Sequence, residues 1–181
     1  MSWTATDEER SYMLSGDDIK AFDPGAVIAL QSNLDDISDI DQLFVNDNGH
    51  AYIFFESKTG EGGGVIGHWS LLIDKGGDNG FEFFDPYGRV LSAAYEKYVK
   101  GHFKEGNHLL DLLKREGEGF TSNERKYQSS DPLYQTCGRH VLMRAMMDHL
   151  NEEEYSKFVD LMMRELKIDN PDDLSIYITE P

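Results

Sequence analysis

Short apolar runs separated by turn residues predict that the chain contains several β-strands. Residues 65–74 and 81–85 are two such runs, and the turn signal at 75–80 between them predicts an antiparallel hairpin. The same pattern predicts further strands at 26–30, 51–55 and 175–179, the last of them at a sheet edge. Residues 120–128 are expected to be extended and to return the chain toward the sheet.

Helical periodicity and capping residues predict helices elsewhere. The clearest helix begins at Cys137, because apolar residues recur after it on one face at the helical period: Val141, Leu142, Ala145, Met146 and Leu150. Further helices are expected at 14–20, 38–44, 95–100, 107–114 and 152–166. Glycine and asparagine predict a turn at 46–49 and a surface loop at 58–64, and residues 1–13 are expected to form a flexible arm.

Together these elements predict one domain over residues 1–181. A chain of 181 residues with 39% hydrophobic residues is long enough to bury a sizeable core. We expect an α+β fold in which a mostly antiparallel central sheet packs against the helix that begins at Cys137.

The charge balance restricts the partners. Asp and Glu number 34 against 17 Lys and Arg, and the net charge of −17 argues against a groove that tracks nucleic acid and against an anionic membrane surface. No apolar run approaches the ~20 residues that span a bilayer, and the polar, acidic residues 1–10 lack the apolar core of a signal peptide. A single cysteine permits no internal disulfide and favours a reducing compartment.

Cys137, the only cysteine, is the first candidate for chemistry. It follows Thr136, a residue type that caps helix N-termini, so its thiol is expected in the first turn of a helix. The positive end of the helix dipole favours thiolate over thiol, and the thiolate is the nucleophilic form. Taken alone, however, a lone cysteine is more often a buried structural residue.

His68 and Asp85 supply the partners that a nucleophilic thiol needs. His68 lies near the start of the first hairpin strand and Asp85 at the end of the second, so antiparallel pairing brings them together across 17 residues of sequence. An imidazole whose second ring nitrogen is oriented by a carboxylate is the arrangement of a general base. This convergence favours a catalytic interpretation over that of a solvated histidine and a turn aspartate.

The other histidines do not extend this pattern. His140 lies one helical turn after Cys137, but no carboxylate is obviously placed to orient it, so we interpret it as a packing or solvent residue. The remaining histidines show no metal-ligand spacing with acidic or sulfur partners, and we expect neither a metal site nor a cofactor.

The ordered set of these residues resembles the adenovirus-type and ubiquitin-like-protein-type cysteine proteases. It consists of His68-Trp69, then Phe84-Asp85-Pro86-Tyr87-Gly88, then Gln128, then Thr136-Cys137-Gly138. Individually these dipeptides are weak signals, but the order His, acid, Gln, Cys and the 17-residue gap are specific. The opening Leu14-Ser15-Gly16-Asp17-Asp18-Ile19 and the Cys-Gly-Arg-His run look most like proteases of large DNA viruses and virophages.

The resemblance implies a role for each matched residue. Cys137 would be the nucleophile, His68 the general base and Asp85 the group that orients it. Gln128 would donate its side-chain amide to the oxyanion, although it lies nine residues before the cysteine, further than is usual; Gln135 is the competing candidate. Trp69 would lie beside the histidine and shield the pair from water, although a half-buried strand aromatic is equally compatible with the sequence. Gly138 would permit close approach of a substrate or of backbone, and we count Trp69 and Gly138 as the substrate-binding candidates.

The same resemblance implies a function. We expect an endopeptidase that cleaves near small residues, glycine above all, in viral capsid or core precursors during virion maturation, and that resides in the virion and the cytoplasm of the infected cell. Two alternatives stay open: a protease for ubiquitin or a similar modifier, and a non-catalytic binding module. We expect a monomer, not secreted, that needs no DNA cofactor, since Lys and Arg form no long run, and no disulfide-linked activator, since the chain has no second cysteine.

Overall fold

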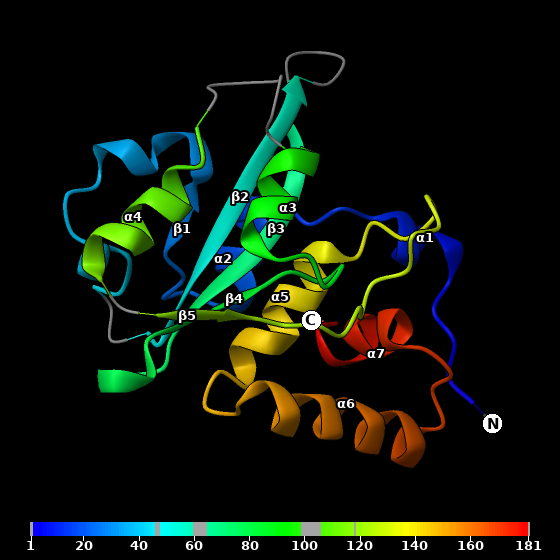
Figure 1. The fold of residues 1–181 in the computed structure, drawn as a ribbon. Helices are drawn as coiled ribbons and strands as arrows, with labels where there is room; N and C mark the ends of the chain where they lie inside the picture. Colours follow the sequence, from blue (N-terminus) through cyan, green and yellow to red (C-terminus); the bar gives the residue numbers. More distant parts are fainter. Residues whose placement is uncertain (1, 46–47, 60–64, 99–105, 118, 181) are drawn as a thin grey trace.

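A five-stranded sheet runs through the middle of the protein (Figure 1). The computed structural model describes residues 2–45, 48–59, 65–98, 106–117 and 119–180. Its strands lie side by side in sequence order: β1 (Ile28–Leu30), β2 (His50–Thr59), β3 (Val65–Asp74), β4 (Phe81–Phe84) and β5 (Phe120–Ser122). The hairpin of β3 and β4 therefore occupies the positions that its hydrophobic pattern predicts.

The sheet is mixed, whereas the sequence suggested a mostly antiparallel one. β2 pairs antiparallel with β3, and β3 antiparallel with β4. The two edge strands pair in parallel instead: β1 runs parallel to β2, and β5 runs parallel to β4. Both edge strands are three residues long and enter the sheet through long connections, which allow parallel pairing. The α+β class holds, with this correction to the sheet.

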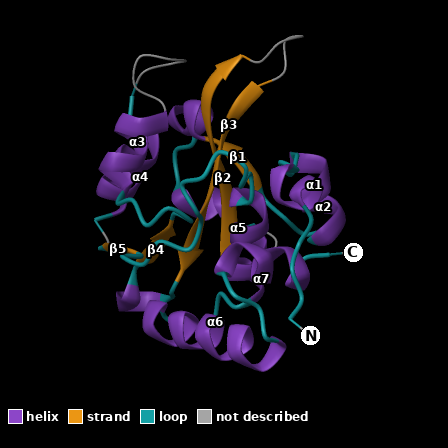
Figure 2. Ribbon diagram, turned by 90° about the vertical axis from the view of Figure 1, so that its right-hand side faces the viewer, coloured by secondary structure: helices purple, strands orange, loops and turns teal. Residues whose placement is uncertain are grey.

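Helices cover both faces of the sheet (Figure 2). The described residues contain seven α-helices: α1 (Asp7–Ser11), α2 (Gly16–Phe22), α3 (Leu91–Tyr98), α4 (His108–Glu116), α5 (Cys137–Met146), α6 (Glu152–Leu166) and α7 (Pro171–Ile178). Helices α3 and α4 lie over one face, while α5 lies over the other with α2, α6 and α7 around it.

Strict alternation along the strands divides the core between the two faces. On β2, Tyr52 and Phe54 belong to the cluster around α5, whereas Ile53 and Phe55 belong to the cluster around α3 and α4. All four side chains are buried. The period of two in a strand produces this division, so β2 is apolar on both sides, as a central strand with helices on each face must be.

Residues 2–13 are not the free arm that their polar composition suggested. They contain α1, which Thr6 begins through a reciprocal capping box with Glu9. Arg10 of this helix forms a bidentate contact with Asp173 of α7, at 2.9 and 2.7 Å. The side-chain contact with α7 and the buried Ala5 fix the segment on the body of the protein.

The C-terminal segment 175–179, expected to be an edge strand, instead forms the end of helix α7, which stops at Ile178 with Thr179 as its C-cap. Asn170 caps the helix by accepting the N–H of Asp173, and Pro171 occupies the first turn. The apolar residues Leu174 and Ile176 alternate like those of a strand, but the helix-start signal before them decides the structure. Both side chains are fully buried in the helix.

Smaller differences concern the connections. The helix expected at 38–44 is the 3₁₀ helix η2 (Ile40–Leu43). Two further 3₁₀ helices, η1 (Gln31–Asp36) and η4 (Gly77–Asn79), were not predicted. Parts of the expected turn at 46–49, of the loop at 58–64 and of the helix at 95–100 lie outside the described residues. Among the described residues, no helix has the length and apolar character needed to cross a bilayer.

Candidate active site

Cys137 is the first residue of α5, so its thiol lies at the positive end of the helix. Thr136 occupies the N-cap position, but its side chain makes no capping hydrogen bond to the helix. Its hydroxyl instead donates to Asp172 of α7, at 2.5 Å. The predicted helix start is therefore correct, while the expected use of the Thr136 hydroxyl is not.

His68 and Asp85 meet at one end of the β3–β4 hairpin, as the pairing rule required. The register places Leu71 opposite Phe84 at the last bridge of β4, and Asp85 follows directly. His68 Nε2 lies 2.7 Å from Asp85 Oδ1, and both side chains are buried. Because Nε2 is bound to the carboxylate, Nδ1 is the ring nitrogen left for the thiol.

Asp85 is fixed by backbone N–H groups as well as by the imidazole. Its Oδ1 accepts the N–H of Tyr87 and its Oδ2 the N–H of Arg89, each at 3.2 Å. The side chain of Asn123 brackets the Asp85 backbone, accepting its N–H at 2.8 Å and donating to its carbonyl at 2.7 Å. The carboxylate is thus held in place before it meets the histidine.

The thiol and the imidazole interact directly. The Cys137 side chain forms a hydrogen bond with His68 and also accepts the backbone N–H groups of Trp69 and Gly138. Burial by itself would raise the pKa of the Cys137 thiol, but these hydrogen bonds and the charge of His68 outweigh it, and the pKa falls below its ordinary range. This lowering favours the nucleophilic thiolate.

The pKa of His68 moves in the complementary direction. Burial would lower it, but the charge of Asp85, its hydrogen bond and the neighbouring Cys137 raise the pKa from the usual 6.5 to about 9. A lowered thiol pKa beside a raised imidazole pKa favours the thiolate–imidazolium pair over the neutral thiol and imidazole.

Aromatic rings that the sequence did not single out surround the imidazole. Tyr98 of α3 stacks on the His68 ring with centroids 4.2 Å apart, and Tyr87 stacks on it at 5.2 Å. Arg89 donates to the Tyr98 hydroxyl at 2.6 Å and lies over the Tyr87 ring. Tyr87 stands within the Phe-Asp-Pro-Tyr-Gly run, but nothing in the sequence indicated that Tyr98, from a separate helix, would reach the histidine.

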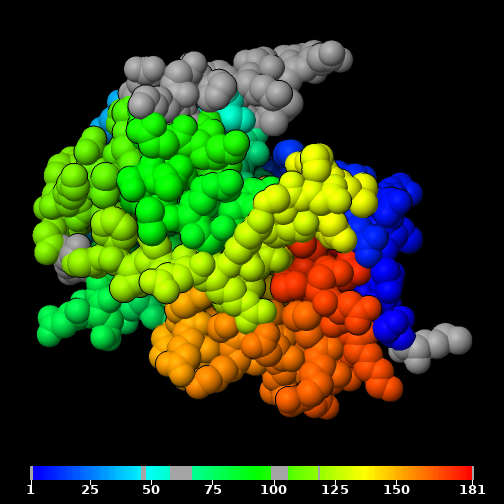
Figure 3. Space-filling model, turned by 45° about the vertical axis from the view of Figure 1, so that its right-hand side comes forward, coloured from blue at the N-terminus to red at the C-terminus, as the bar shows by residue number. Residues whose placement is uncertain are grey.

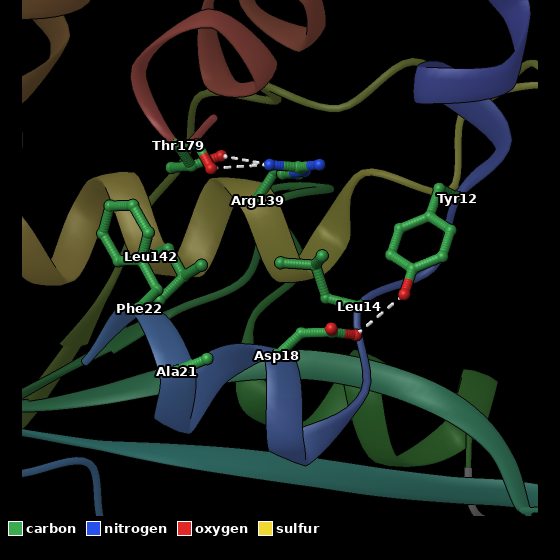
Figure 4. Close-up of a pocket in the computed structure, with 8 residues that line it drawn as sticks. All are labelled: Tyr12, Leu14, Asp18, Ala21, Phe22, Arg139, Leu142 and Thr179. Atoms are coloured by element: carbon green, nitrogen blue, oxygen red, sulfur yellow. Dashed lines mark hydrogen bonds between the residues drawn. The ribbon is translucent and has the colours of Figure 1, made fainter. Parts of the chain in front are cut away.

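Trp69 and Gly138 hold the N-terminal segment beside the thiol. The Trp69 indole is buried, and its Nε1 donates to the Leu14 carbonyl at 2.9 Å. A Cβ on Gly138 would lie 2.8 Å from the Leu14 Cβ, so only glycine fits there. The close approach that Gly138 permits is thus that of Leu14, which also lines a cavity on the outer side of α5 together with Arg139 (Figure 4).

Among the described residues, neither candidate glutamine forms a hydrogen bond with the thiol through its side-chain amide. Gln128 is buried, and its Nε2 donates to the Tyr134 carbonyl at 3.0 Å. Its Oε1 is buried without a hydrogen-bond partner among the described residues. Gln135 donates to the Pro132 carbonyl at 3.0 Å on the outer side of the same loop. The backbone N–H of Gln128 donates to the carbonyl of Pro86, the residue that follows Asp85, so Gln128 is anchored beside the triad carboxylate.

His140 does have a carboxylate partner, contrary to the expectation from sequence. Its Nε2 lies 2.9 Å from Asp172 Oδ1, and its side chain is completely buried. The carboxylate comes from the first turn of α7, in the part of the chain where the sequence pattern favours a strand. His140 is indeed a packing residue, but one with a defined polar contact. Within the described part of the chain, no cluster of three or more His, Cys, Asp or Glu side chains is arranged to hold a metal ion.

Comparison with curated proteins finds one relative across nearly the whole length. It is the "Uncharacterized protein V9" of Sputnik virophage, 31% identical over 176 residues, which cover 94% of this chain and 95% of that protein. The chain belongs to the family of this virophage protein. No protein-family model matches the chain. This relative comes from a virus, and its name states no activity.

Proposed function

We propose that the protein is a cysteine peptidase in which Cys137, His68 and Asp85 form the catalytic triad. One observation carries this proposal: His68 Nε2 lies 2.7 Å from the buried Asp85 carboxylate, and the same imidazole and the Cys137 thiol at the start of α5 shift each other's pKa toward imidazolium and thiolate. An inert structural cysteine in an apolar core would have a raised thiol pKa, whereas the pKa of Cys137 is lowered.

The geometry supports a two-step acyl transfer. The Cys137 thiolate attacks the scissile carbonyl carbon, and a C–S bond forms as the carbonyl electrons move to oxygen. As the tetrahedral species collapses, the C–N bond breaks and the His68 imidazolium gives its proton to the leaving amine. A water then attacks the thioester carbonyl while His68 takes a proton from that water. The C–S bond breaks, the carboxylic acid product is released, and the Cys137 thiolate is regenerated.

Stabilisation of the oxyanion is the remaining requirement. The first N–H groups of α5 point out of the helix without intrahelical partners, and those of Cys137 and Gly138 flank the nucleophile. Gln128 supplies a third donor if its amide turns so that Nε2 leaves the Tyr134 carbonyl. The buried Oε1 without a partner supports this assignment, because the present orientation leaves a polar atom unsatisfied.

The surroundings of the thiol support a preference for small residues before the cut. Cys137 is 3% exposed, and Leu14, Trp69 and the stacked tyrosines enclose the pair. A glycine-containing segment approaches such a thiol with the least steric conflict. The virophage relative supports a viral setting. We accordingly propose an adenovirus-protease-like fold and a role in processing viral structural or core polyproteins.

A direct test combines labelling with peptide cleavage. Iodoacetamide is expected to alkylate Cys137 faster near neutral pH than it alkylates a free thiol such as glutathione, and glycine-containing peptides from a library are expected to be cleaved. Cys137→Ala and His68→Ala should lose cleavage. Slow labelling together with absent cleavage would favour the non-catalytic module, whereas cleavage confined to ubiquitin-like C-terminal tails would favour the modifier protease.

A further inference from the structure

The C-terminal helix α7 reaches both ends of the segment that leads into the nucleophile. Asp172, in the first turn of α7, is buried, and its Oδ2 accepts the backbone N–H of Ser129 at 2.9 Å. Its Oδ1 accepts the Thr136 hydroxyl at 2.5 Å. Ser129 directly follows Gln128 and Thr136 directly precedes Cys137, so one carboxylate joins the residues beside the proposed oxyanion donor and the proposed nucleophile.

His140 completes this arrangement from within α5. Its Nε2 lies 2.9 Å from the same Oδ1 that accepts the Thr136 hydroxyl, and both partners are buried. Burial would raise the pKa of Asp172, but the contacts with His140, Thr136 and Ser129 lower it overall. Asp172 is therefore an anionic acceptor near neutral pH, and charge-assisted hydrogen bonds of this kind are about twice as strong as neutral ones.

A second tether from α7 holds the C-terminal part of the same segment, just before Thr136. Asp173 binds Arg10 through two hydrogen bonds, and the Arg10 carbonyl accepts the N–H of Gln135 at 2.7 Å. The Arg10 guanidinium also lies over the Tyr134 ring. In Figure 3 this segment (yellow) crosses the surface over α7 (red), with the N-terminal residues (blue) beside it. The neighbouring carboxylates of α7 thus hold both ends of one loop, the C-terminal end through two separate tethers.

We propose that Asp172, with His140 and Thr136, is a positioning residue that sets the oxyanion-binding side of the active site. The inference rests on the proposed peptidase function. Asp172 does not touch the reacting atoms. It fixes Ser129 and Thr136, and through them the distance between the Gln128 amide and the N-terminus of α5. The side chains of His68 and Asp85 are held by β3, β4 and Asn123, while the segment meets Pro86, the neighbour of Asp85, through the backbone N–H of Gln128.

This separation gives the inference a specific kinetic signature. Peptide hydrolysis builds an oxyanion and needs the donors in place, whereas alkylation by iodoacetamide is a displacement at a saturated carbon and needs only the thiolate. Loss of one oxyanion donor costs ~10²–10³ in kcat. Displacing the loop should therefore reduce kcat for hydrolysis and leave the alkylation rate and its pH profile nearly unchanged.

The decisive variant is Asp172→Asn, which keeps the shape and removes the charge and one acceptor. We expect kcat on a glycine-containing peptide to fall about 10²-fold, with KM and the alkylation rate changed by less than about threefold. The matched control is Asp148→Asn. Asp148 follows the other end of α5, where it lies 2.8 Å from His50 Nδ1, so this change also breaks a His–Asp contact but should leave kcat within about threefold.

Smaller substitutions at Thr136 keep the test decisive if Asp172→Asn does not fold. Thr136→Val removes one hydroxyl and should lower kcat about tenfold, while Thr136→Ser retains it and should restore the wild-type value. The inference is overturned if Asp172→Asn matches Asp148→Asn in kcat, if it loses alkylation and hydrolysis equally, or if Thr136→Val matches wild type. A wild-type protein that neither cleaves peptides nor shows enhanced alkylation would instead overturn the peptidase proposal itself.

Discussion

Replacing Asp85 by asparagine tests the electrostatics of the proposed triad most directly. The carboxylate offers Oδ1 to His68 and the Tyr87 N–H, and Oδ2 to the Arg89 N–H. An asparagine that keeps its oxygen toward His68 must turn its NH₂ group toward the Arg89 N–H, where two donors face each other. The substitution thus keeps the volume, removes the charge beside the imidazole and leaves one buried donor without an acceptor.

The size of the effect follows from the pKa of His68. Its rise from 6.5 to about 9 corresponds to about 3 kcal/mol in favour of the imidazolium, shared between the Asp85 carboxylate and the Cys137 thiolate. Because the folded pKa is the higher one, this stabilisation is complete below about pH 6.5 and disappears as the pH rises through about 9. If Asp85 supplies most of this stabilisation, Asp85→Asn returns the pKa of His68 to near 6.5. The protonated fraction of His68 at about pH 8 then falls from ~0.9 to ~0.03, about 30-fold.

The assay is the pH dependence of Cys137 alkylation and of kcat/KM. In Asp85→Asn the alkaline limb of the kcat/KM profile, which reports the His68 imidazolium, should move from about pH 9 toward neutral pH, while its acidic limb and the alkylation profile, which report the thiol, should move less. The defect should therefore be small near pH 6 and grow as the pH rises. Asp74→Asn, at the exposed end of β3, is the matched control and should retain the wild-type profile.

An unchanged alkaline limb in Asp85→Asn would refute the assignment of Asp85 as the group that holds the imidazolium. The same reasoning ranks the two triad partners. Asparagine can still accept a hydrogen bond from Nε2, whereas His68→Ala removes the base, so the loss in kcat/KM should be smaller for Asp85→Asn. Equal losses near pH 6, where the charge matters least, would contradict this division of roles.

Four further outcomes are expected. Cys137→Ala should abolish peptide cleavage while the far-UV circular dichroism and the thermal midpoint remain close to wild type. Gly138→Ala should lower the free energy of unfolding by about 1–2 kcal/mol in urea titrations, because overpacking against Leu14 costs ~1–3 kcal/mol and the better helix propensity of alanine returns ~0.5–1 kcal/mol. Gln128→Ala should lower kcat ~10²–10³-fold and Gln135→Ala should not, so equal effects would remove Gln128 from the oxyanion site. Duplex DNA should not stimulate cleavage at any point of a salt series, because the net charge is −17; a large, salt-sensitive increase would show that a local basic surface outweighs that charge.

The sequence predicted those parts of the fold that depend on local pattern. The β3–β4 hairpin appears where its alternating residues and its turn place it, and α6 has the predicted bounds. The meeting of His68 and Asp85 follows from antiparallel pairing alone, which is why two residues 17 apart in sequence could be assigned to one site. Cys137 was placed at a helix start for the same kind of local reason.

The predictions from sequence failed where a local pattern fitted both helix and strand, or where contacts between distant elements determined the structure. Leu174 and Ile176 alternate like a strand, but Asn170 and Pro171 before them are a helix start, and the buried helix accommodates both apolar residues. The parallel pairing of β1 and β5 depends on the paths of long connections, which no short window of sequence reports. Tyr98 reached His68 because α3 packs on β2, a contact between distant elements.

The error in α7 and the error about His140 have one physical origin. If residues 175–179 formed a strand, Asp172 would lie in a turn, away from the buried imidazole of His140. Once Asn170 and Pro171 begin a helix, its first turn carries Asp172 into the core beside Thr136 and His140. A buried histidine on the nucleophile's helix implied an acceptor from elsewhere in the chain, because a buried polar side chain needs a hydrogen-bond partner. Accounting for that partner would have pointed to the aspartates of the C-terminal segment, and to the contact that joins α7 to the residues around Cys137.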